Sequence, residues 1–303
     1  MIFNLEHSTN EQIFLPEKLG IELFIKREDK IHSFVSGNKY RKLKYNLLEA
    51  DKMGFKTVLT FGGAYSNHIA AVASAGDVLG FKTIGIIRGD ELENAVNSNP
   101  TLSFAKDCGM QFKFVSRESY RAKTTNTFIE KLKAEFGNFY LVPEGGTNDL
   151  AIKGCEEILN DRDKNFDYIC CAVGTGGTVA GLINCSKPSQ QVLGFPALKG
   201  DFLHQDISKF ATKNNWKLIT DYHFGGYAKI NEELVTFINQ FKNKNNIPID
   251  PVYTGKMMYG IFDLIEKGYF PNGTKILAIH TGGLQGISGM NTVLKKKNLQ
   301  IIE

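Results

Sequence analysis

The stretch YICCAVGTGGTVAGLINC, residues 168–185, decides the fold class. An apolar run at 168–173 leads into the glycine-rich turn GTGGT at 174–178, and a helix-like segment follows to residue 185. A fully apolar strand that enters a helix through a glycine turn is typical of parallel sheets covered by helices. The stretch therefore predicts the α/β class, with a ligand site beyond the carboxyl end of the strand.

The same alternation continues along the 303 residues, a length that suits one large or two medium domains. Further strands are expected at 22–26, 57–61, 83–87, 111–115, 139–142, 191–195 and 275–279. Helices are expected at 40–53, 67–79, 101–108, 125–136, 150–160, 178–185, 232–242 and 255–267, and a surface loop at 242–248. Because no low-complexity linker divides the chain, a domain boundary has to be inferred from function.

Composition excludes several classes of protein. Hydrophobic residues make up 42% and charged residues 22%, which is ordinary for a globular protein, and the net charge is only +4. The one dense basic run, Lys295-Lys296-Lys297, is expected to be a solvated helix end, so no nucleic-acid partner is predicted. The sequence shows neither a secretory signal nor an apolar run of membrane-spanning length, so no membrane association is predicted.

The number and spacing of the cysteines indicate the redox state of the cellular compartment. They are odd in number and show no C-x-x-C spacing: Cys108, Cys155, Cys170, Cys171 and Cys185. A disulfide framework and a metal site are therefore not expected, and we predict a reducing cytoplasm.

The turn at 174–178 has the composition of a phosphate cradle. Glycines allow close backbone approach, and amide groups converge on a ligand at a helix N-terminus. Val179 stands where a third glycine of G-x-G-x-x-G would be, which disfavours a dinucleotide and leaves a compact phosphate. Taken alone, the stretch fits a tight strand-to-helix turn equally well.

Two other motifs carry polar side chains. In GGAYSNH, residues 62–68, Ser66 is a sound N-cap, and His68 taken alone is a structural histidine. In DPVYTGKMMYG, residues 250–260, Asp250 fits a turn before a helix, and Tyr253 taken alone is a core residue.

Lys39 follows the turn Ser36-Gly37-Asn38 at the start of an expected helix. The positive end of the helix dipole and the charges of Arg41 and Lys42 should lower the lysine pKa from its usual value of about 10.4. A lysine tuned in this way serves as a nucleophile or base, whereas a solvated cation is the ordinary alternative.

Together, these motifs resemble the pyridoxal-phosphate enzymes of the tryptophan synthase β-like fold. Within that fold the sequence is most similar to the family of 1-aminocyclopropane-1-carboxylate deaminase and D-cysteine desulfhydrase. The resemblance rests on KRED at 26–29, SGNKYRKL at 36–43, GGAYSNH, VPEGGTN at 142–148, VGTGGTVAGL at 173–182, DPVYTGKMMYG and HTGG at 280–283.

The resemblance implies a type II fold of two open, mainly parallel, three-layer α/β domains. A large domain would combine residues 1–42 and 151–303, and a small domain would span 43–150. Pyridoxal 5'-phosphate would lie in the cleft between them, and the protein would form a homodimer. The chain is short for the family before KRED and between GTGGTVAGL and FGGYAKI at 224–230.

The resemblance also assigns roles. Lys39 would form a Schiff base with the cofactor, Asn67 would contact its ring hydroxyl, and Ser66 would meet the substrate carboxylate. Tyr227 and Tyr253 would line the substrate site, and Thr254 and Thr281 would stand near the pyridine ring. The phosphate would be held by Gly174, Thr175, Gly176, Gly177 and Thr178.

Thr254 and Thr281 favour one branch of the family. The deaminase is expected to carry Glu and Leu at these positions, whereas the desulfhydrase carries threonines. We therefore predict β-elimination from a small D-amino acid, with D-cysteine giving pyruvate, sulfide and ammonia. The alternatives are a deaminase that converts 1-aminocyclopropane-1-carboxylate to 2-oxobutanoate and ammonia, a non-catalytic pyridoxal-phosphate-binding protein, and a binder of phosphosugars or nucleotides.

Overall fold

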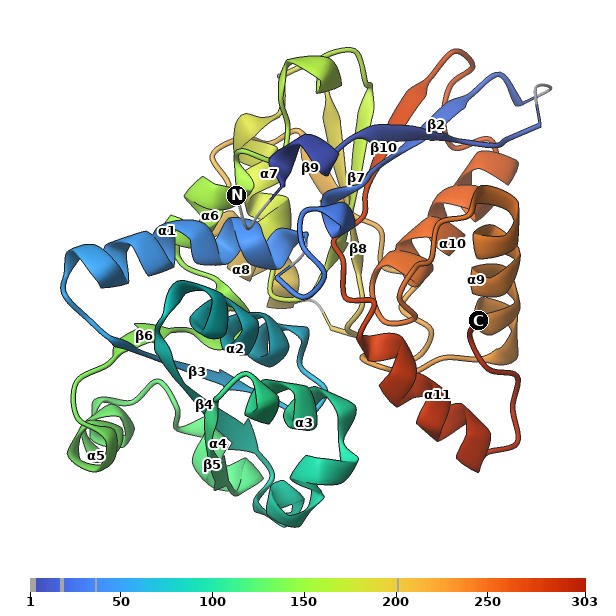
Figure 1. Cartoon of the computed structure of the whole chain (residues 1–303). Helices are drawn as coiled ribbons and strands as arrows, with labels where there is room; N and C mark the ends of the chain where they lie inside the picture. Colours follow the sequence, from blue (N-terminus) through green and yellow to red (C-terminus); the bar gives the residue numbers. More distant parts are fainter. Residues whose placement is uncertain (1–3, 17–18, 36, 201) are drawn as a thin grey trace.

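The computed structural model describes residues 4–16, 19–35, 37–200 and 202–303. In this part of the chain two sheets lie side by side, each with helices packed on it (Figure 1). The large sheet has the strand order β1-β2-β10-β7-β8-β9, and the small sheet has the order β5-β4-β3-β6. The strands are β1 Asn10–Ile13, β2 Glu22–Lys26, β3 Thr57–Gly62, β4 Lys82–Arg88, β5 Gln111–Val115, β6 Tyr140–Val142, β7 Tyr168–Val173, β8 Gln191–Pro196, β9 Trp216–Leu218 and β10 Lys275–Ile279.

The helices alternate with these strands. They are α1 Asn38–Lys52, α2 Asn67–Leu79, α3 Pro100–Asp107, α4 Arg117–Arg121, α5 Asn126–Phe136, α6 Asp149–Cys155, α7 Gly177–Cys185, α8 Phe202–Ser208, α9 Glu232–Asn245, α10 Thr254–Glu266 and α11 Gly286–Lys296. Among the described strands, only β1 and β2 pair antiparallel, and all other neighbours are parallel. The expectation of mainly parallel sheets is therefore confirmed.

Both faces of the large sheet are buried. Successive side chains of a strand point to opposite faces, so Cys170 and Ala172 of β7 pack with α9 and α10. Ile169 and Cys171 pack on the other face with α6, α7 and α8. This is why YICCAV is apolar at every position, and it confirms the three-layer arrangement.

The small sheet is built in the same way. Val58 of β3 faces a cluster formed with α1, α2 and α3, whereas Leu59 and Phe61 face a cluster formed with α4 and α5. Leu43 and Leu47 of α1 join the first cluster, so this helix packs against the small sheet.

All eight expected strands are present, with ends that shift by one residue at most. The missed strands β1 and β9 are short edge strands, and β1 has the sequence NEQI, which lacks an apolar alternation. The expected loop at 242–248 is wrong in its first part, because α9 continues to Asn245 and ends at Asn246 in the left-handed conformation. The helix expected at 150–160 ends earlier, at Cys155.

The sheets follow the expected division of the chain, although α1 does not. The strands of the small sheet fall within 43–150, and those of the large sheet fall within 1–42 and 151–303. Helix α1 begins at Asn38 and crosses the expected boundary at residue 42. The boundaries themselves therefore stay a prediction.

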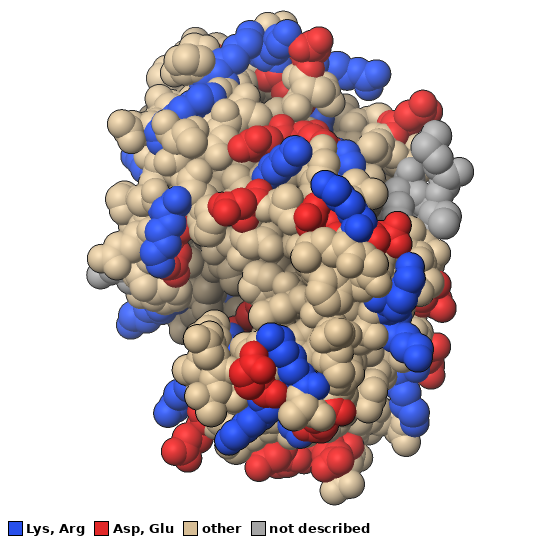
Figure 2. Space-filling view, turned by 90° about the vertical axis from the view of Figure 1, so that its left-hand side faces the viewer, with Lys and Arg blue, Asp and Glu red and all other residues tan. Residues whose placement is uncertain are grey.

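The charges on the surface are mixed. On the face shown in Figure 2, basic and acidic side chains are interspersed, in keeping with the net charge of +4. Lys295 and Lys296 close the last turn of α11, where cations interact favourably with the helix dipole. In the described ranges, every helix is too short or too polar to cross a membrane.

Candidate active site

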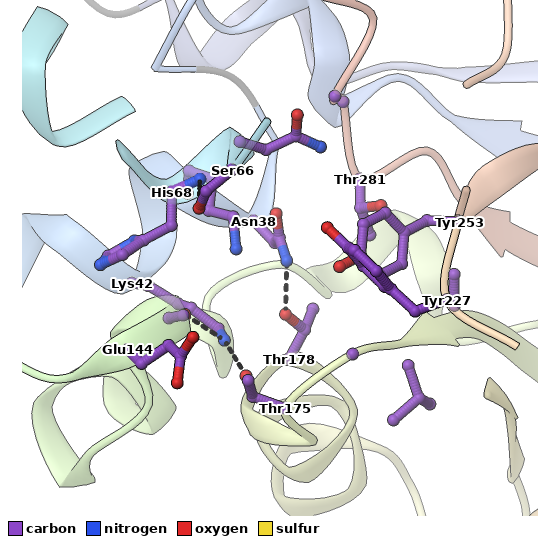
Figure 3. Close-up of a pocket in the computed structure, with 18 of the residues that line it drawn as sticks. Asn38, Lys42, Ser66, His68, Glu144, Thr175, Thr178, Tyr227, Tyr253 and Thr281 are labelled. Atoms are coloured by element: carbon purple, nitrogen blue, oxygen red, sulfur yellow. Dashed lines mark hydrogen bonds between the residues drawn. The ribbon is translucent and has the colours of Figure 1, made fainter. Parts of the chain in front are cut away.

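A cavity of about 390 Å³ lies where carboxyl ends of strands from both sheets meet. Its walls come from the loops after β3, β6, β7 and β10, together with the first turn of α1. Ligands of open α/β sheets bind at such ends, and the cavity is within the size range of small-molecule sites. Figure 3 shows the polar side chains that line it.

Gly37 allows α1 to begin against the loop that follows β10. It is the N-cap residue of α1 and has φ 57° and ψ −137°, a conformation that favours glycine. A Cβ atom at this position would lie 2.1 Å from the carbonyl oxygen of Thr281. The glycine therefore lets Lys39, two residues later, reach the cavity beside that loop.

We expect Gly37→Ala to lower the free energy of unfolding by at least about 2 kcal/mol, because backbone strain and a backbone clash add. Gly54→Ala is the matched control, since Gly54 has φ 78° but no atom within 4 Å of the added methyl group. Urea denaturation measures both. Equal losses in the two variants would show that the contact with Thr281 is unimportant.

A buried ion pair fixes the first turns of α1. The Arg41 Nε and Nη2 atoms donate to the Glu28 carboxylate at 2.8 and 2.9 Å, and the Ser8 hydroxyl donates to the same carboxylate at 2.5 Å. Glu28 is fully buried and Arg41 nearly so. Because breaking a buried pair is strongly destabilising, this contact holds α1, and with it Lys39, in one position.

The Lys39 amine is tuned as the sequence predicts, but mainly by burial. Burial and, to a lesser degree, the charge of Lys42 lower its pKa from 10.5 to about 7. Arg41, the other side-chain charge that was expected to lower this pKa, is paired with Glu28 and does not contribute. At neutral pH about half of this amine is therefore unprotonated.

We expect Lys39 of the cofactor-free protein to react with acetic anhydride with a half-maximal rate near pH 7. The sign follows from the lowered pKa: only the neutral amine reacts, and its fraction rises through pH 7 and then levels off. Free lysine side chains, with a pKa of about 10.4, supply the reference curve. Mass spectrometry of the peptide that contains Lys39 measures the rate, and an inflection near pH 10 would contradict the assignment.

Lys42 is a site residue that the sequence reasoning left open. The residue is 2% exposed, and its amine donates to the Gly145 carbonyl at 2.9 Å, to the Thr147 hydroxyl at 3.0 Å and to the Thr175 hydroxyl at 3.2 Å (Figure 3). All these acceptors are uncharged, so the positive charge remains available to an anion. Its position three residues after Lys39, on the same helix face, is a signal that could have identified it.

The turn at 174–178 forms a cradle at the N-terminus of α7. Gly176, with φ 82°, is the N-cap residue and has no side chain to occupy the first amide groups of the helix. A Cβ atom at Gly177 would lie 3.1 Å from the Lys42 amine, and the Asn38 amide donates to the Thr178 hydroxyl at 2.9 Å. Free amide groups, hydroxyls and a buried cation together suit a phosphate.

The loop before α2 contributes Ser66, Asn67 and His68 to the cavity wall. The Ser66 hydroxyl accepts from the amides of His68 at 3.2 Å and Ile69 at 3.3 Å, so the expected N-cap is confirmed. The Asn67 amide lies against the loop after β10, 2.6 Å from the position that a Cβ atom at Gly283 would take.

His68 is a buried structural histidine. The Thr60 hydroxyl donates to the Val142 carbonyl, so it accepts from His68 Nε2 at 2.8 Å. Burial, followed by the charges of Lys39 and Lys42, lowers the pKa of His68 well below its usual value, so the ring is neutral.

Two tyrosines face the cavity from the large-sheet side. Tyr227 and Tyr253 have ring centroids 6.2 Å apart in an edge-to-face arrangement (Figure 3). Burial, with a contribution from Tyr227, raises the pKa of Tyr253 well above 10, so its hydroxyl stays protonated. Thr281 also lines the cavity.

Thr254 is not brought to the cavity. Its amide donates to Asp250 Oδ2 at 2.8 Å, and its buried hydroxyl has no partner among the described residues. Asp250 also accepts from the amides of Val252 and Tyr253, which fixes the start of α10. Tyr253, the N-cap residue of α10, lines the cavity, whereas Thr254, the first residue of the helix, does not.

Arg88 and Glu144, which the sequence reasoning did not single out, line the cavity from the small-sheet side. Each stands at or just after the end of a parallel strand, a positional signal that could have identified them. The predicted residues Lys39, Ser66, Asn67, Tyr227, Tyr253 and Thr281 meet in the same cavity with Gly174, Thr175, Gly176 and Thr178.

A family model described as "Pyridoxal-phosphate dependent enzyme" matches residues 11–282. The chain therefore belongs to the pyridoxal-phosphate-dependent enzymes, and the free amine, the phosphate cradle and the buried cation described above fit this cofactor.

Comparison with individual proteins shows which pyridoxal-phosphate-dependent enzymes this chain is similar to. The chain is 33% identical to the bifunctional D-cysteine desulfhydrase/1-aminocyclopropane-1-carboxylate deaminase of Arabidopsis thaliana, with 88% of this chain and 74% of the relative covered. It is 28% identical to a D-cysteine desulfhydrase of Klebsiella pneumoniae, with 89% of each chain covered. A crystal structure described as an ACC deaminase homologue has a TM-score of 0.80 at 28% identity and covers 97% of this chain and 96% of the other. The expected family and type II fold are thus confirmed.

Proposed function

We propose that this protein catalyses β-elimination from a small D-amino acid, and that D-cysteine is its preferred substrate. The α-proton and the bond from the β-carbon to sulfur are lost, and the sulfur leaves with the bonding electrons. Water then hydrolyses the released enamine to pyruvate and ammonia. Pyridoxal phosphate, when bound, supplies the electron sink for the electron pair left at the α-carbon.

The observation that supports this choice is that, among the described residues that line the cavity, no carboxylate stands beside Thr281. Glu144 is the only carboxylate among the described residues that line the cavity, and Figure 3 shows it on the side away from Thr281. A carboxylate near the pyridine nitrogen would keep that nitrogen protonated, and a hydroxyl cannot supply the charge. Loss of a thiolate, a good leaving group, requires less electron withdrawal than opening a cyclopropane ring.

The residues of the cavity have distinct proposed roles. Lys39 would hold the cofactor covalently and, once displaced by substrate, its amine with a pKa of about 7 would take the α-proton. Lys42 and the turn at 174–178 would hold the phosphate, Asn67 the ring hydroxyl, and Ser66 the substrate carboxylate. Tyr253, protonated at neutral pH, would supply a proton to the leaving sulfur, with Tyr227 beside it.

Product analysis tests this proposal. The purified, cofactor-loaded protein is given D-cysteine, L-cysteine, D-serine and 1-aminocyclopropane-1-carboxylate, and pyruvate, 2-oxobutanoate, sulfide and ammonia are measured. We expect pyruvate and sulfide from D-cysteine. Formation of 2-oxobutanoate from the cyclopropane substrate, with D-cysteine untouched, would favour the deaminase alternative.

Borohydride reduction separates binding from catalysis. We expect it to fix the cofactor on the peptide that contains Lys39. Fixation without any product would leave the non-catalytic alternative, and a cofactor fixed on another lysine would overturn the role of Lys39.

The domain limits, the homodimer and the cytoplasmic location also remain our proposals. The match of the two sheets to 43–150 and to the rest of the chain supports the first, and the family resemblance supports the second. The five free cysteines support a reducing compartment. Light scattering of the purified protein tests the dimer.

A further inference from the structure

Polar side chains gather where the four strands of the small sheet end. Because these strands are parallel, their carboxyl ends meet at one side of the cavity, which we call the rim. The rim consists of Gly63 after β3, Arg88 at the end of β4, Tyr120 and Lys123 after β5, and Glu144 after β6.

The carboxylate of the rim is already neutralised. The Tyr120 hydroxyl donates to Glu144 Oε1 at 2.8 Å, and the Lys123 amine lies 3.2 Å from Glu144 Oε2. Lys123 also lies over the Tyr120 ring, 4.8 Å from its centroid. Glu144 therefore has both a counter-charge and a hydrogen-bond donor.

Arg88 has no such partner. Across the residues that the structure describes, its guanidinium makes neither a hydrogen bond nor an ion pair. It lies 5.8 Å from the centroid of the Tyr120 ring, and its Nη2 atom is 3.7 Å from the position of a Cβ atom at Gly63, at the start of the loop that carries Ser66. Its five donors thus remain free at the wall of the cavity.

The positive charge of Arg88 affects the pKa of a tyrosine on the opposite side of the cavity. Burial raises the pKa of Tyr227 and its hydrogen bond with Tyr253 lowers it; of the nearby charges, Asp250 and Glu144 raise this pKa and Arg88 lowers it. Arg88 and Tyr227 therefore bound the same space from opposite sheets.

The other cations that line the cavity already have proposed binding partners. Lys39 is assigned to the cofactor aldehyde and Lys42 to the phosphate, and Ser66 at the N-terminus of α2 is assigned to the substrate α-carboxylate. The rim then retains one surplus positive charge, because Lys123 and Glu144 cancel. A substrate with a neutral side chain would leave this charge unused.

We propose that Arg88 extends the substrate range beyond D-cysteine by binding a negatively charged group at the end of the substrate side chain, such as a sulfate or a carboxylate. A planar guanidinium with free donors binds such oxyanions in a bidentate manner. The inference rests on the proposed β-elimination and extends it to substrates with an anionic side chain.

Two reactive probes test the role of Arg88. O-sulfo-D-serine and 3-chloro-D-alanine undergo the same elimination, in which sulfate or chloride leaves with the electron pair and both give pyruvate and ammonia. We expect Arg88→Gln to lower the ratio of their kcat/KM values, sulfate over chloride, by about tenfold, and Arg88→Lys to lower it less. Arg117→Gln, an exposed arginine paired with Glu91 outside the cavity, should leave the ratio unchanged.

A binding measurement keeps this inference separate from the proposed reaction. Calorimetry with the cofactor-loaded protein compares both enantiomers of aspartate and alanine, which have no leaving group at the β-carbon. We expect Arg88→Gln to weaken aspartate binding about tenfold relative to alanine, even if D-cysteine gives no pyruvate. An unchanged ratio would overturn the proposal. If the ratio is unchanged because aspartate and alanine lose affinity equally, Arg88 holds the α-carboxylate instead.

Discussion

Replacing Lys39 by alanine is expected to lower turnover of the cofactor-loaded protein by at least about 10³-fold, because the covalent attachment and the base are lost together. The fold should persist, since burial disfavours the charged amine and no hydrogen bond of Lys39 Nζ occurs among the described residues. Sulfide and pyruvate release measure turnover, and thermal denaturation of the cofactor-free protein measures the fold.

A small amine separates the two roles of Lys39. Ethylamine added to Lys39→Ala should restore part of the turnover, because it supplies a base without covalent attachment. Lys52→Ala, an exposed lysine on the same helix, is the control and should behave like the wild type. Retention of more than a tenth of the turnover in Lys39→Ala would refute the assignment.

Replacing Lys42 by methionine is expected to weaken cofactor binding by about 100-fold, the loss of one charged hydrogen bond to an anion. Methionine keeps the length of the side chain but removes the charge, and it leaves Gly145, Thr147 and Thr175 without their common donor. Cofactor titration followed by absorbance gives the dissociation constant.

Two further measurements test whether the lost cofactor affinity comes from the contact between Lys42 and the phosphate. The added thermal stability that pyridoxal phosphate gives the wild type should shrink in Lys42→Met at equal cofactor concentration. Pyridoxal, which lacks the phosphate, should bind both proteins nearly alike, and Lys52→Met serves as the surface control. A loss of affinity that is as large for pyridoxal as for its phosphate would place Lys42 elsewhere in the site.

The fold was predictable because its signals are local. The run Tyr168–Val173 is apolar at every position since both of its faces are buried, and most of the other expected parallel strands contain a shorter run of buried residues. The short strand β9 and the polar strand β1 lack that pattern, because an edge strand is stabilised by its neighbour more than by its own side chains.

The site was predictable only in part. Glycine turns and helix caps depend on residues that are adjacent in the sequence, so Gly37, Ser66 and the turn at 174–178 could be identified from the sequence. The acceptors of Lys42 lie more than 100 positions away in the chain, so no local pattern reveals them. Thr254 could not be separated from Tyr253 by motif, because the backbone conformation at the start of α10 decides which side chain lines the cavity.

The sequence by itself therefore determined the two mainly parallel sheets, the lysine at the start of α1 and the glycine cradle, because these follow from periodicity and backbone freedom within a few residues. Only the tertiary structure decided the pKa of Lys39, the free charge of Lys42 and the unpaired Arg88 at the rim. Those properties depend on burial and on charges from distant segments, and the folded chain alone brings them within reach of one another.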